Sequence, residues 1–354
     1  MSYHDALNYL AKKTSVVELY DQLGGRVAIC PEWNGRVLTS TYDGLDGNSF
    51  GCINVQAIET EDFEDFGGED QWTISPLDIA YSVENITEHN ASLCRTIRMA
   101  DANGKLAELN LSRTVSLLNR QNMGALFGDA LVDALTQEDV SVVAFRTKNT
   151  IRSTEKVCVA SRQRGMFNAC PHTFVIVSTP PDNLPDSLMA SPLPVDIDYL
   201  GGSPHGRIRH ISGALLIRVD GHSRCQATMP FSAAPPIFGA IELRFGTLTL
   251  WTFDIPRVSE ERKRTRESVE EEGADAEEGD IIRIYNHGRP HTAGVDWTTY
   301  YEMNCFSVAR ELLPENSFTF RQCTLHINAG NDILGNLVQQ IFDVSLDNFP
   351  KDVR

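Results

Sequence analysis

The chain has 354 residues, of which 42% are hydrophobic and 22% are charged, and its formal net charge is −17. This composition is typical of a folded protein and excludes a largely disordered chain. The acid excess argues against a protein that binds nucleic acid or docks on anionic lipid, because both need clustered Lys and Arg.

Helical periodicity is confined to a few segments of the chain. Tyr3–Lys13 and Asn122–Leu135 each gather apolar residues on one side, although glycines weaken the second segment. Asp332–Val344 carries the best apolar stripe at helical spacing. We therefore expect helices at both ends of the chain and one near its middle.

Most of the chain shows the alternation or the short apolar runs of β-strands. Leu109–Leu117 is the clearest strand, because apolar residues and Arg113 alternate with polar residues without a break. The other expected strands are Val16–Leu19, Arg26–Cys30, Arg36–Thr41, Ser141–Arg146, Thr173–Ser178, Ala214–Val219, Leu243–Phe253, Ile281–Tyr285, Tyr300–Ser307 and Ser317–Ile327. Many short strands separated by turn residues predict an all-β sandwich or barrel. No repeat of fixed period is present, and we expect a single domain over residues 1–354.

Some segments have compositions unlike those of the strands. Val258–Asp280 holds ten acidic residues, four basic residues and no aromatic residue, so we expect a mobile surface loop there. Pro180–Pro204 is rich in Pro and Gly and predicts a long surface coil. Met1–Lys13 lacks the apolar core of a secretory signal, and the eight cysteines form no CxxC motif. We therefore expect reduced thiols and a cytoplasmic location.

The first candidate site is the acidic segment Glu59–Trp72, which holds seven acids and no base. Its Gly67–Gly68 pair permits a tight turn ahead of Glu69, Asp70 and Trp72. Carboxylates accept hydrogen bonds from sugar hydroxyls, and an indole covers the apolar face of a sugar ring. Glu69–Trp72 therefore indicates a sugar site, although Trp72 could equally be a core residue, and we favour a solvated loop for Glu59–Asp65.

Two charged residues interrupt apolar strand faces. Arg113 requires partners if it is buried, either a ligand or, as we favour, a structural neighbour in the core. Glu302 interrupts the apolar strand Tyr300–Ser307, and a buried carboxylate is a suitable general base. Strand alternation also allows Glu302 to point away from the face that carries Tyr301 and Met303.

The nine histidines show no metal-binding spacing. His287 and His291 form an HxxxH motif, but Gly288 and Pro290 disfavour a helix that would present both to one metal. The sequence contains no HExxH, P-loop, GxSxG or GxGxxG motif. We therefore expect neither a metal nor a cofactor.

Several motifs, taken together, resemble an uncharacterised bacterial family of galactose mutarotase-like proteins. They are GRVLTST at Gly35–Thr41, SFGCIN at Ser49–Asn54, GGEDQW at Gly67–Trp72, GMFN at Gly165–Asn168, GDIIRIYNHGRP at Gly279–Pro290 and the block Tyr301–His326. The terminal block is similar to the end of aldose mutarotases, where a catalytic Glu lies in a strand. The resemblance implies a β supersandwich of two large antiparallel sheets with a few short helices, and a site for a mono- or oligosaccharide.

The resemblance also implies roles for individual residues. Glu302 matches the catalytic base. The resemblance does not provide the acid, for which His287 and His210 are our candidates from elsewhere in the fold. The expected substrate-binding residues are Arg36, Glu69, Asp70, Trp72, Arg113, Tyr285 and Asn286. The chain departs from the mutarotase pattern at the two usual histidines, where Phe66 precedes the Gly pair and Arg164 stands at the acid position.

Three functions follow from these residues. The first is an aldose mutarotase or epimerase that uses general acid–base chemistry. The second is a carbohydrate-binding or sensing protein that has kept the fold and lost the acid. The third is a glycoside hydrolase or lyase, which needs a second carboxylate beside Glu302, for which Glu69 and Asp70 are the candidates.

Overall fold

The computed structural model describes residues 1–73, 80–100, 106–137, 139–178, 207–211, 213–222, 224–230, 234–255, 280–288, 299–307 and 310–350. The predicted coil Pro180–Pro204 lies outside these ranges. So does the predicted acidic loop Val258–Asp280, except for its last residue, which begins a strand.

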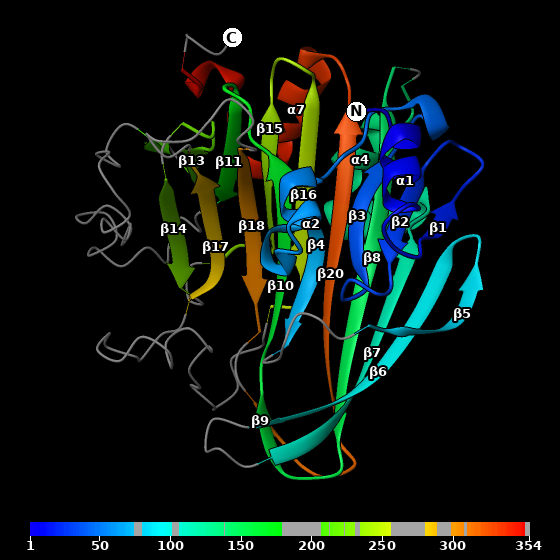
Figure 1. The fold of residues 1–354 in the computed structure, drawn as a ribbon. Helices are drawn as coiled ribbons and strands as arrows, with labels where there is room; N and C mark the ends of the chain where they lie inside the picture. Colours follow the sequence, from blue (N-terminus) through cyan, green and yellow to red (C-terminus); the bar gives the residue numbers. More distant parts are fainter. Residues whose placement is uncertain are drawn as a thin grey trace.

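Short helices and many strands make up the described chain (Figure 1). The helices and helical turns are α1 Tyr3–Leu10, η1 Gly44–Asp46, α2 Val55–Glu59, η2 Phe63–Asp65, α3 Arg120–Phe127, α4 Asp129–Ala134, α7 Asn331–Phe342 and η5 Leu346–Asn348. The strands are β1 Val17–Tyr20, β2 Arg26–Cys30, β3 Arg36–Thr41, β4 Gly68–Thr73, β5 Ser82–Thr87, β6 Asn90–Ala100, β7 Leu106–Leu117, β8 Ser141–Ser153, β9 Val157–Val159, β10 Ser161–Asn168, β11 Thr173–Ser178, β12 Ile208–Ile211, β13 Ala214–Arg218, β14 Cys225–Pro230, β15 Ile237–Glu242, β16 Thr247–Phe253, β17 Asp280–His287, β18 Tyr300–Phe306, β19 Arg310–Leu312 and β20 Ser317–Asn328.

The strands form two large antiparallel sheets that pack face to face. The front sheet, which lies toward the viewer in Figure 1, has eight strands in the order β1-β2-β3-β4-β10-β18-β17-β14. The back sheet has ten strands in the order β12-β13-β11-β15-β16-β20-β8-β7-β6-β5, and β9 pairs with β19 separately. The predicted all-β fold of two large antiparallel sheets with a few short helices is confirmed.

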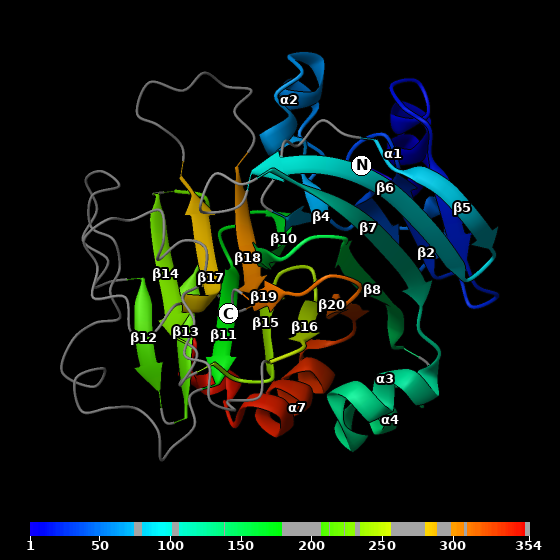
Figure 2. The ribbon, with the colours of Figure 1, turned by 90° about the horizontal axis from the view of Figure 1, so that it is seen from below.

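The main hydrophobic core lies between the two sheets, because alternate residues of each strand point inward. Met303 and Ile284 of the front sheet pack there with Trp251 and Phe238 of the back sheet. A second core lies on the far face of the back sheet, where α7 buries Leu334, Leu337 and Val338. Figure 2 shows α3, α4 and α7 on that side and α1 and α2 on the opposite side, against the front sheet.

The helices α1 and α2 cover only part of the outer face of the front sheet. Leu10 and Ile58 pack there against Leu38 and Phe66 in a small separate core. Further along the same face, β10, β18 and β17 carry polar and charged side chains outward. The candidate residues gather on this part of the front sheet.

The structure corrects several sequence expectations. The helix expected over Asn122–Leu135 is two helices, because Gly128 has a positive φ of 94° between α3 and α4. Only Thr247–Phe253 of the strand expected over Leu243–Phe253 is extended, since the preceding residues turn the chain from β15 into β16. The sequence patterns did not predict α2 or the strands β4, β5, β6, β9, β10, β12, β14, β15 and β19. All eight cysteines are free thiols, as expected.

No helix in the described part of the chain is long and apolar enough to cross a membrane.

Candidate functional site

Strand alternation places one set of charged residues on the outer face of the front sheet. On β18, Tyr301, Met303 and Cys305 enter the core, so Glu302 and Asn304 point outward. The register sets Asp70 of β4 opposite Arg164 of β10, and Arg164 opposite Asn304. A polar row therefore crosses the strands β4, β10 and β18.

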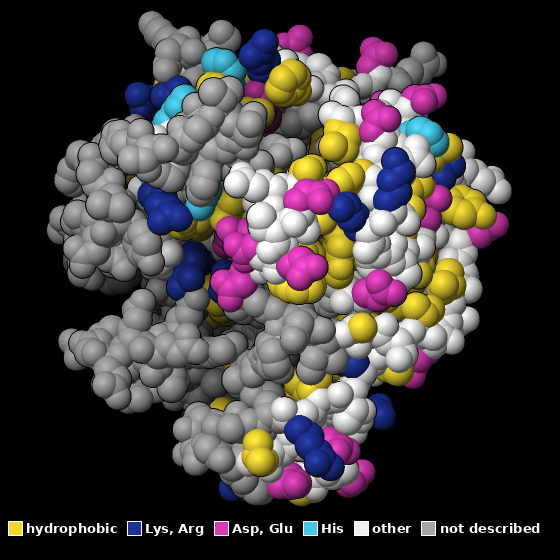
Figure 3. Space-filling view, viewed as in Figure 1, with side chains coloured by type: hydrophobic (Ala, Val, Ile, Leu, Met, Phe, Trp, Pro, Cys, Tyr) yellow, Lys and Arg dark blue, Asp and Glu magenta, His cyan; other side chains and the backbone are white. Residues whose placement is uncertain are grey.

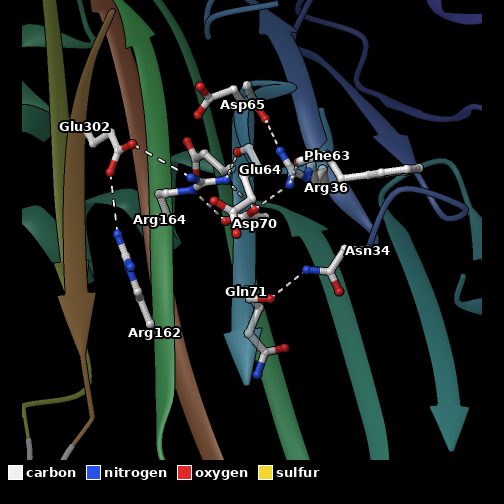
Figure 4. A network of polar contacts seen from close by, with 12 residues as sticks. Asn34, Arg36, Phe63, Glu64, Asp65, Asp70, Gln71, Arg162, Arg164 and Glu302 are labelled. Carbon is white, nitrogen blue, oxygen red and sulfur yellow. Dashed lines mark hydrogen bonds and ion pairs between the residues drawn. The ribbon is translucent and has the colours of Figure 1, made fainter. Parts of the chain in front are cut away.

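Asp70 lies at one end of this row, and its side chain is fully buried (Figure 4). Its carboxylate lies 3.0 Å from Arg36 Nη2 and 3.1 Å from Arg164 Nη2. Burial lowers the pKa of Arg36 to about 10, although Asp70 acts in the opposite direction. Burial also acts to lower the pKa of Arg164, but Asp70 and Glu302 outweigh it and the net shift is upward. Both guanidinium groups are therefore protonated at neutral pH.

Both arginines also hold the segment that precedes β4 against the sheet. Arg36 donates hydrogen bonds to the carbonyl oxygens of Gly67, at 3.2 Å, and of Phe63. Arg164 donates to the carbonyl oxygen of Glu64. Asp70 thus neutralises two buried cations that fix η2 over the face.

The glycine pair before Asp70 serves backbone packing. Gly67 and Gly68 have φ values of +98° and +69°. A Cβ on Gly67 would lie 1.8 Å from the Cys52 carbonyl oxygen, and one on Gly68 would lie 2.4 Å from that of Val37. The glycines permit a tight turn, as the sequence predicted, and their backbone packs against other segments of the chain.

Glu302 lies at the other end of the row, and only 6% of the residue is exposed. Its Oε2 accepts hydrogen bonds from Asn304 Nδ2 at 3.2 Å and from Arg162 Nη2 at 3.5 Å. Its Oε1 lies 3.8 Å from Arg164 Nη1. Arg162 is itself held by Asn304 Oδ1, at 3.1 Å from Nε and 2.9 Å from Nη2. The carboxylate is therefore fixed in position by partners from its own strand and from β10.

A group of aromatic residues lies beside Glu302 on the same face. Tyr285 is directly opposite Glu302 in the β17–β18 register, and His287 is opposite Tyr300. The imidazole of His287 stacks on the Tyr300 ring, with centroids 4.3 Å apart, and its Nδ1 is 3.1 Å from the Tyr285 hydroxyl. The Tyr300 hydroxyl donates to Asp65 at 3.1 Å. Diagonal neighbours of this kind lie about 7–8 Å apart across a sheet, which places His287 near Glu302.

Burial controls the protonation of this group. It lowers the pKa of His287 to about 4, and Arg224 adds to the shift. It raises the pKa of Asp65 as well, although Tyr300 and Arg164 act against the shift. His287 is therefore a neutral imidazole at neutral pH.

The space-filling view shows a recess on this face (Figure 3). Basic, acidic and histidine side chains lie along its walls, over the part of the front sheet that β17 and β18 form. Arg162 is 18% exposed in its side chain, so its guanidinium reaches this surface. The recess thus offers charged hydrogen-bonding groups at its surface, whereas Tyr300 and His287 are only 3% and 4% exposed.

The structure brings together about half of the residues that the sequence singled out. Glu302, Asp70, Arg36, Tyr285 and His287 share the outer face of the front sheet. His210 lies on β12, the edge strand of the back sheet, away from the sheet that carries Glu302. Trp72 lies on β4, and the side chains of Trp72 and His210 are outside the described part of the structure.

Glu69, Arg113 and Asn286 face the interior instead. Arg113 is fully buried and donates to the Gly35 carbonyl oxygen at 2.8 Å and to Asn149 Oδ1 at 2.9 Å. Glu69 accepts from the Thr324 hydroxyl at 2.7 Å, and burial raises its pKa to about 8. Asn286 accepts from the Gly221 backbone N–H at 3.0 Å. Glu69 and Asn286 of the front sheet and Arg113 of the back sheet therefore make their contacts inside the sandwich, on the side of the front sheet away from Glu302.

Arg162, Asn304 and Tyr300 are site residues that were not predicted, and Asp65 belongs to the segment Glu59–Asp65, for which we favoured a solvated loop. Alternation in Ser161–Asn168 gives the signal for Arg162, because Arg162 and Arg164 alternate there with Gln163 and Gly165. In the described part of the chain no group of three His, Cys, Asp or Glu side chains is placed to hold a metal ion.

The chain matches the model of a protein family of unknown function, DUF6786, over residues 1–83 and 77–352. No curated protein matches it. Among solved structures it is similar to an aldose epimerase homologue from C. elegans, with 8% identity, a TM-score of 0.48, and 90% of this chain and 100% of that chain covered. It is also similar to a galactose mutarotase-like protein from Clostridium acetobutylicum, with 11% identity, a TM-score of 0.47, and 90% and 99% covered. A galactose mutarotase related enzyme from Lactobacillus acidophilus gives 9% identity, a TM-score of 0.46, and 90% and 99% covered.

Proposed function

The chain belongs to the DUF6786 family, and we propose that it binds a sugar on the outer face of its front sheet and interconverts the anomers of that sugar. One observation carries this proposal. Glu302 is a fixed, largely buried carboxylate on that face, and its neighbours Tyr285 and His287 lie on the adjacent strand. A carboxylate beside an imidazole and aromatic rings suits a hydroxylated ring, whose O–H groups donate and whose C–H faces stack.

In this proposal Glu302 moves a proton between the two oxygens of the anomeric carbon. It takes the proton from the anomeric hydroxyl as the bond from that carbon to the ring oxygen breaks. It returns the proton to the former ring oxygen, which leaves an open-chain aldehyde. The aldehyde group rotates, and the reverse steps close the ring on its other face.

His287 has a supporting role that its protonation state defines. A neutral imidazole donates one hydrogen bond and accepts another. If the Tyr285 hydroxyl donates to Nδ1, then Nε2 carries the hydrogen of the neutral imidazole. A hydrogen bond from Nε2–H to the ring oxygen stabilises the negative charge that develops there as the ring opens.

Arg164 favours a second function, sugar binding without catalysis. It occupies the position that resembles the general acid of mutarotases, and its raised pKa means that it keeps its proton. Its guanidinium also lies 3.8 Å from Glu302, where it compensates the charge of that carboxylate. A protein with these contacts would hold a sugar through charged hydrogen bonds alone.

Neither of the two carboxylates that the sequence offered as partners of Glu302 supports the third function, glycosidic bond cleavage. Asp70 is enclosed by two arginines, and Glu69 faces the interior of the sandwich.

Magnetisation transfer between sugar anomers, measured by NMR, separates the two candidates. We expect the wild-type protein to accelerate anomer exchange for at least one of D-glucose, D-galactose and D-mannose, and the Glu302→Gln variant to lose the acceleration. Glu311→Gln is the matched control, because Glu311 of β19 is an exposed carboxylate, which pairs with Lys156 at 2.8 Å. Binding without faster exchange would establish the second function, and no binding to any sugar would exclude both.

A further inference from the structure

A pocket of about 320 Å³ opens between the two sheets, away from the outer face that carries Glu302. The back sheet lines it with Thr173, Glu242, Thr247 and Thr249. The front sheet and its loops line it with aromatic rings, among them Phe50, Phe167 and Tyr301. The pocket therefore has one polar wall and one aromatic wall.

Glu242 is the acidic residue of the described lining, to which the N-terminal residue Met1 also contributes, and only 7% of Glu242 is exposed. Its Oε2 accepts from the Phe245 backbone N–H, whereas its Oε1 has no hydrogen-bond partner among the described residues. The hydroxyl of Thr173, directly opposite Glu242 in the β11–β15 register, is also buried without a described partner. Unsatisfied polar atoms therefore cluster at one point of the polar wall.

No described residue forms an ion pair with Glu242. Arg244, two residues further on, lies instead over the Phe245 ring at 5.5 Å. The charge of Glu242 acts on its surroundings, since burial and then Glu242 raise the pKa of the Cys170 thiol, although Arg244 acts against this shift. A buried carboxylate without a cation is unfavourable, and proteins pair such groups. An empty pocket thus leaves Glu242 Oε1 and the Thr173 hydroxyl without a hydrogen-bond partner among the described residues.

The opposite wall suits a cation as well. The Phe167 and Tyr301 rings lie 5.5 Å apart, and Phe50 lies 4.9 Å from Tyr42. Ring faces attract ammonium groups electrostatically, and a carboxylate supplies the opposite charge. A single carboxylate among aromatic rings fits an organic cation better than a metal ion, which needs several oxygen, nitrogen or sulfur ligands.

We propose that this pocket binds a small organic ammonium ion, with Glu242 as its counter-ion and the aromatic wall around its alkyl part. The proposal is independent of the sugar site, because Glu302 and Glu242 lie on different sheets and different faces.

Saturation-transfer difference NMR with n-butylammonium chloride tests this site, with n-butanol as the uncharged probe of the same length. We expect the wild-type protein to bind n-butylammonium and to bind n-butanol at least about tenfold more weakly, because a hydrogen bond to a charged group is replaced by a neutral one. The Glu242→Gln variant should lose the preference, while the Glu311→Gln control keeps it. Glu242→Gln should also unfold at a higher temperature than the empty wild type, since the substitution removes an unpaired buried charge.

The comparison of the two probes on the wild type tests the proposal even if the variant does not fold. Equal binding of n-butylammonium and n-butanol would overturn it, as would no binding of n-butylammonium. Undiminished n-butylammonium binding by Glu242→Gln would also overturn it. Loss of sugar binding in Glu302→Gln has no bearing on this outcome.

Discussion

The charge at Asp70 is expected to be the largest single electrostatic contribution to the stability of the candidate site. Asp70 is fully buried and lies 3.0 Å and 3.1 Å from the guanidinium groups of Arg36 and Arg164. The Asp70→Asn substitution keeps the shape and one acceptor oxygen but leaves two buried like charges without their counter-ion. Removing one partner of a buried pair costs about 3–5 kcal/mol. Since Asn still accepts hydrogen bonds, we expect a loss of about 3 kcal/mol, at the lower end of that range.

Equilibrium unfolding in urea measures this loss, and Asp254→Asn is the matched control. Asp254 pairs with Arg321 at 3.1 Å, but the side chains are 42% and 48% exposed. An exposed pair contributes at most about 1 kcal/mol, so the control should lose far less. Added salt should reduce the small effect at Asp254 and leave the effect at Asp70 nearly unchanged, because buried pairs are screened little. Equal losses in the two variants would show that Asp70 does not neutralise buried charge.

Other substitutions and pH changes test the remaining parts of the site. Burial raises the pKa of Glu69 from 4.5 to about 8. The protonated carboxyl therefore contributes fully to the free energy of unfolding below pH 4.5, and this contribution is lost as the pH rises toward 8. In urea unfolding, Glu69→Gln should make the decline of the free energy of unfolding over this pH range less steep. Arg113→Met should lower the free energy of unfolding by about 3 kcal/mol, because it leaves buried acceptors unsatisfied, yet calorimetry should show sugar affinity unchanged. Burial holds the pKa of His287 at about 4, so anomer exchange should show no His287 titration between pH 6 and 8, and a midpoint near 6.5 would contradict its burial.

Strand alternation made much of the fold predictable. The strands Arg26–Cys30, Arg36–Thr41 and Thr173–Ser178 have the expected bounds, because their apolar runs stand between clear turns. The strand β10 was missed because two arginines, Gln163 and Gly165 give it the composition of a loop. Its arginines are tolerated in a sheet only because Asp70, Glu302 and Asn304 on adjacent strands satisfy them.

The sequence predicted which types of residue make up the candidate site, but not which face of the sheet each residue occupies. Glu69 and Asp70 are consecutive, so one must enter the sandwich when the other points outward. The sequence alone does not tell which sheet face a mixed strand buries, and it grouped Glu69 with Asp70. Arg113 likewise reads as a site residue or a core residue until Gly35 and Asn149 are placed around it.

Calorimetric titration of D-glucose, D-galactose and D-mannose into Glu302→Gln and Glu69→Gln tests the central claim most directly. These variants make the same chemical change on opposite faces of the front sheet. The account predicts that Glu302→Gln loses the affinity of the wild type for the sugar it binds, and that Glu69→Gln keeps that affinity. Equal affinity in the two variants, or the reverse order, would contradict a sugar site on the outer face.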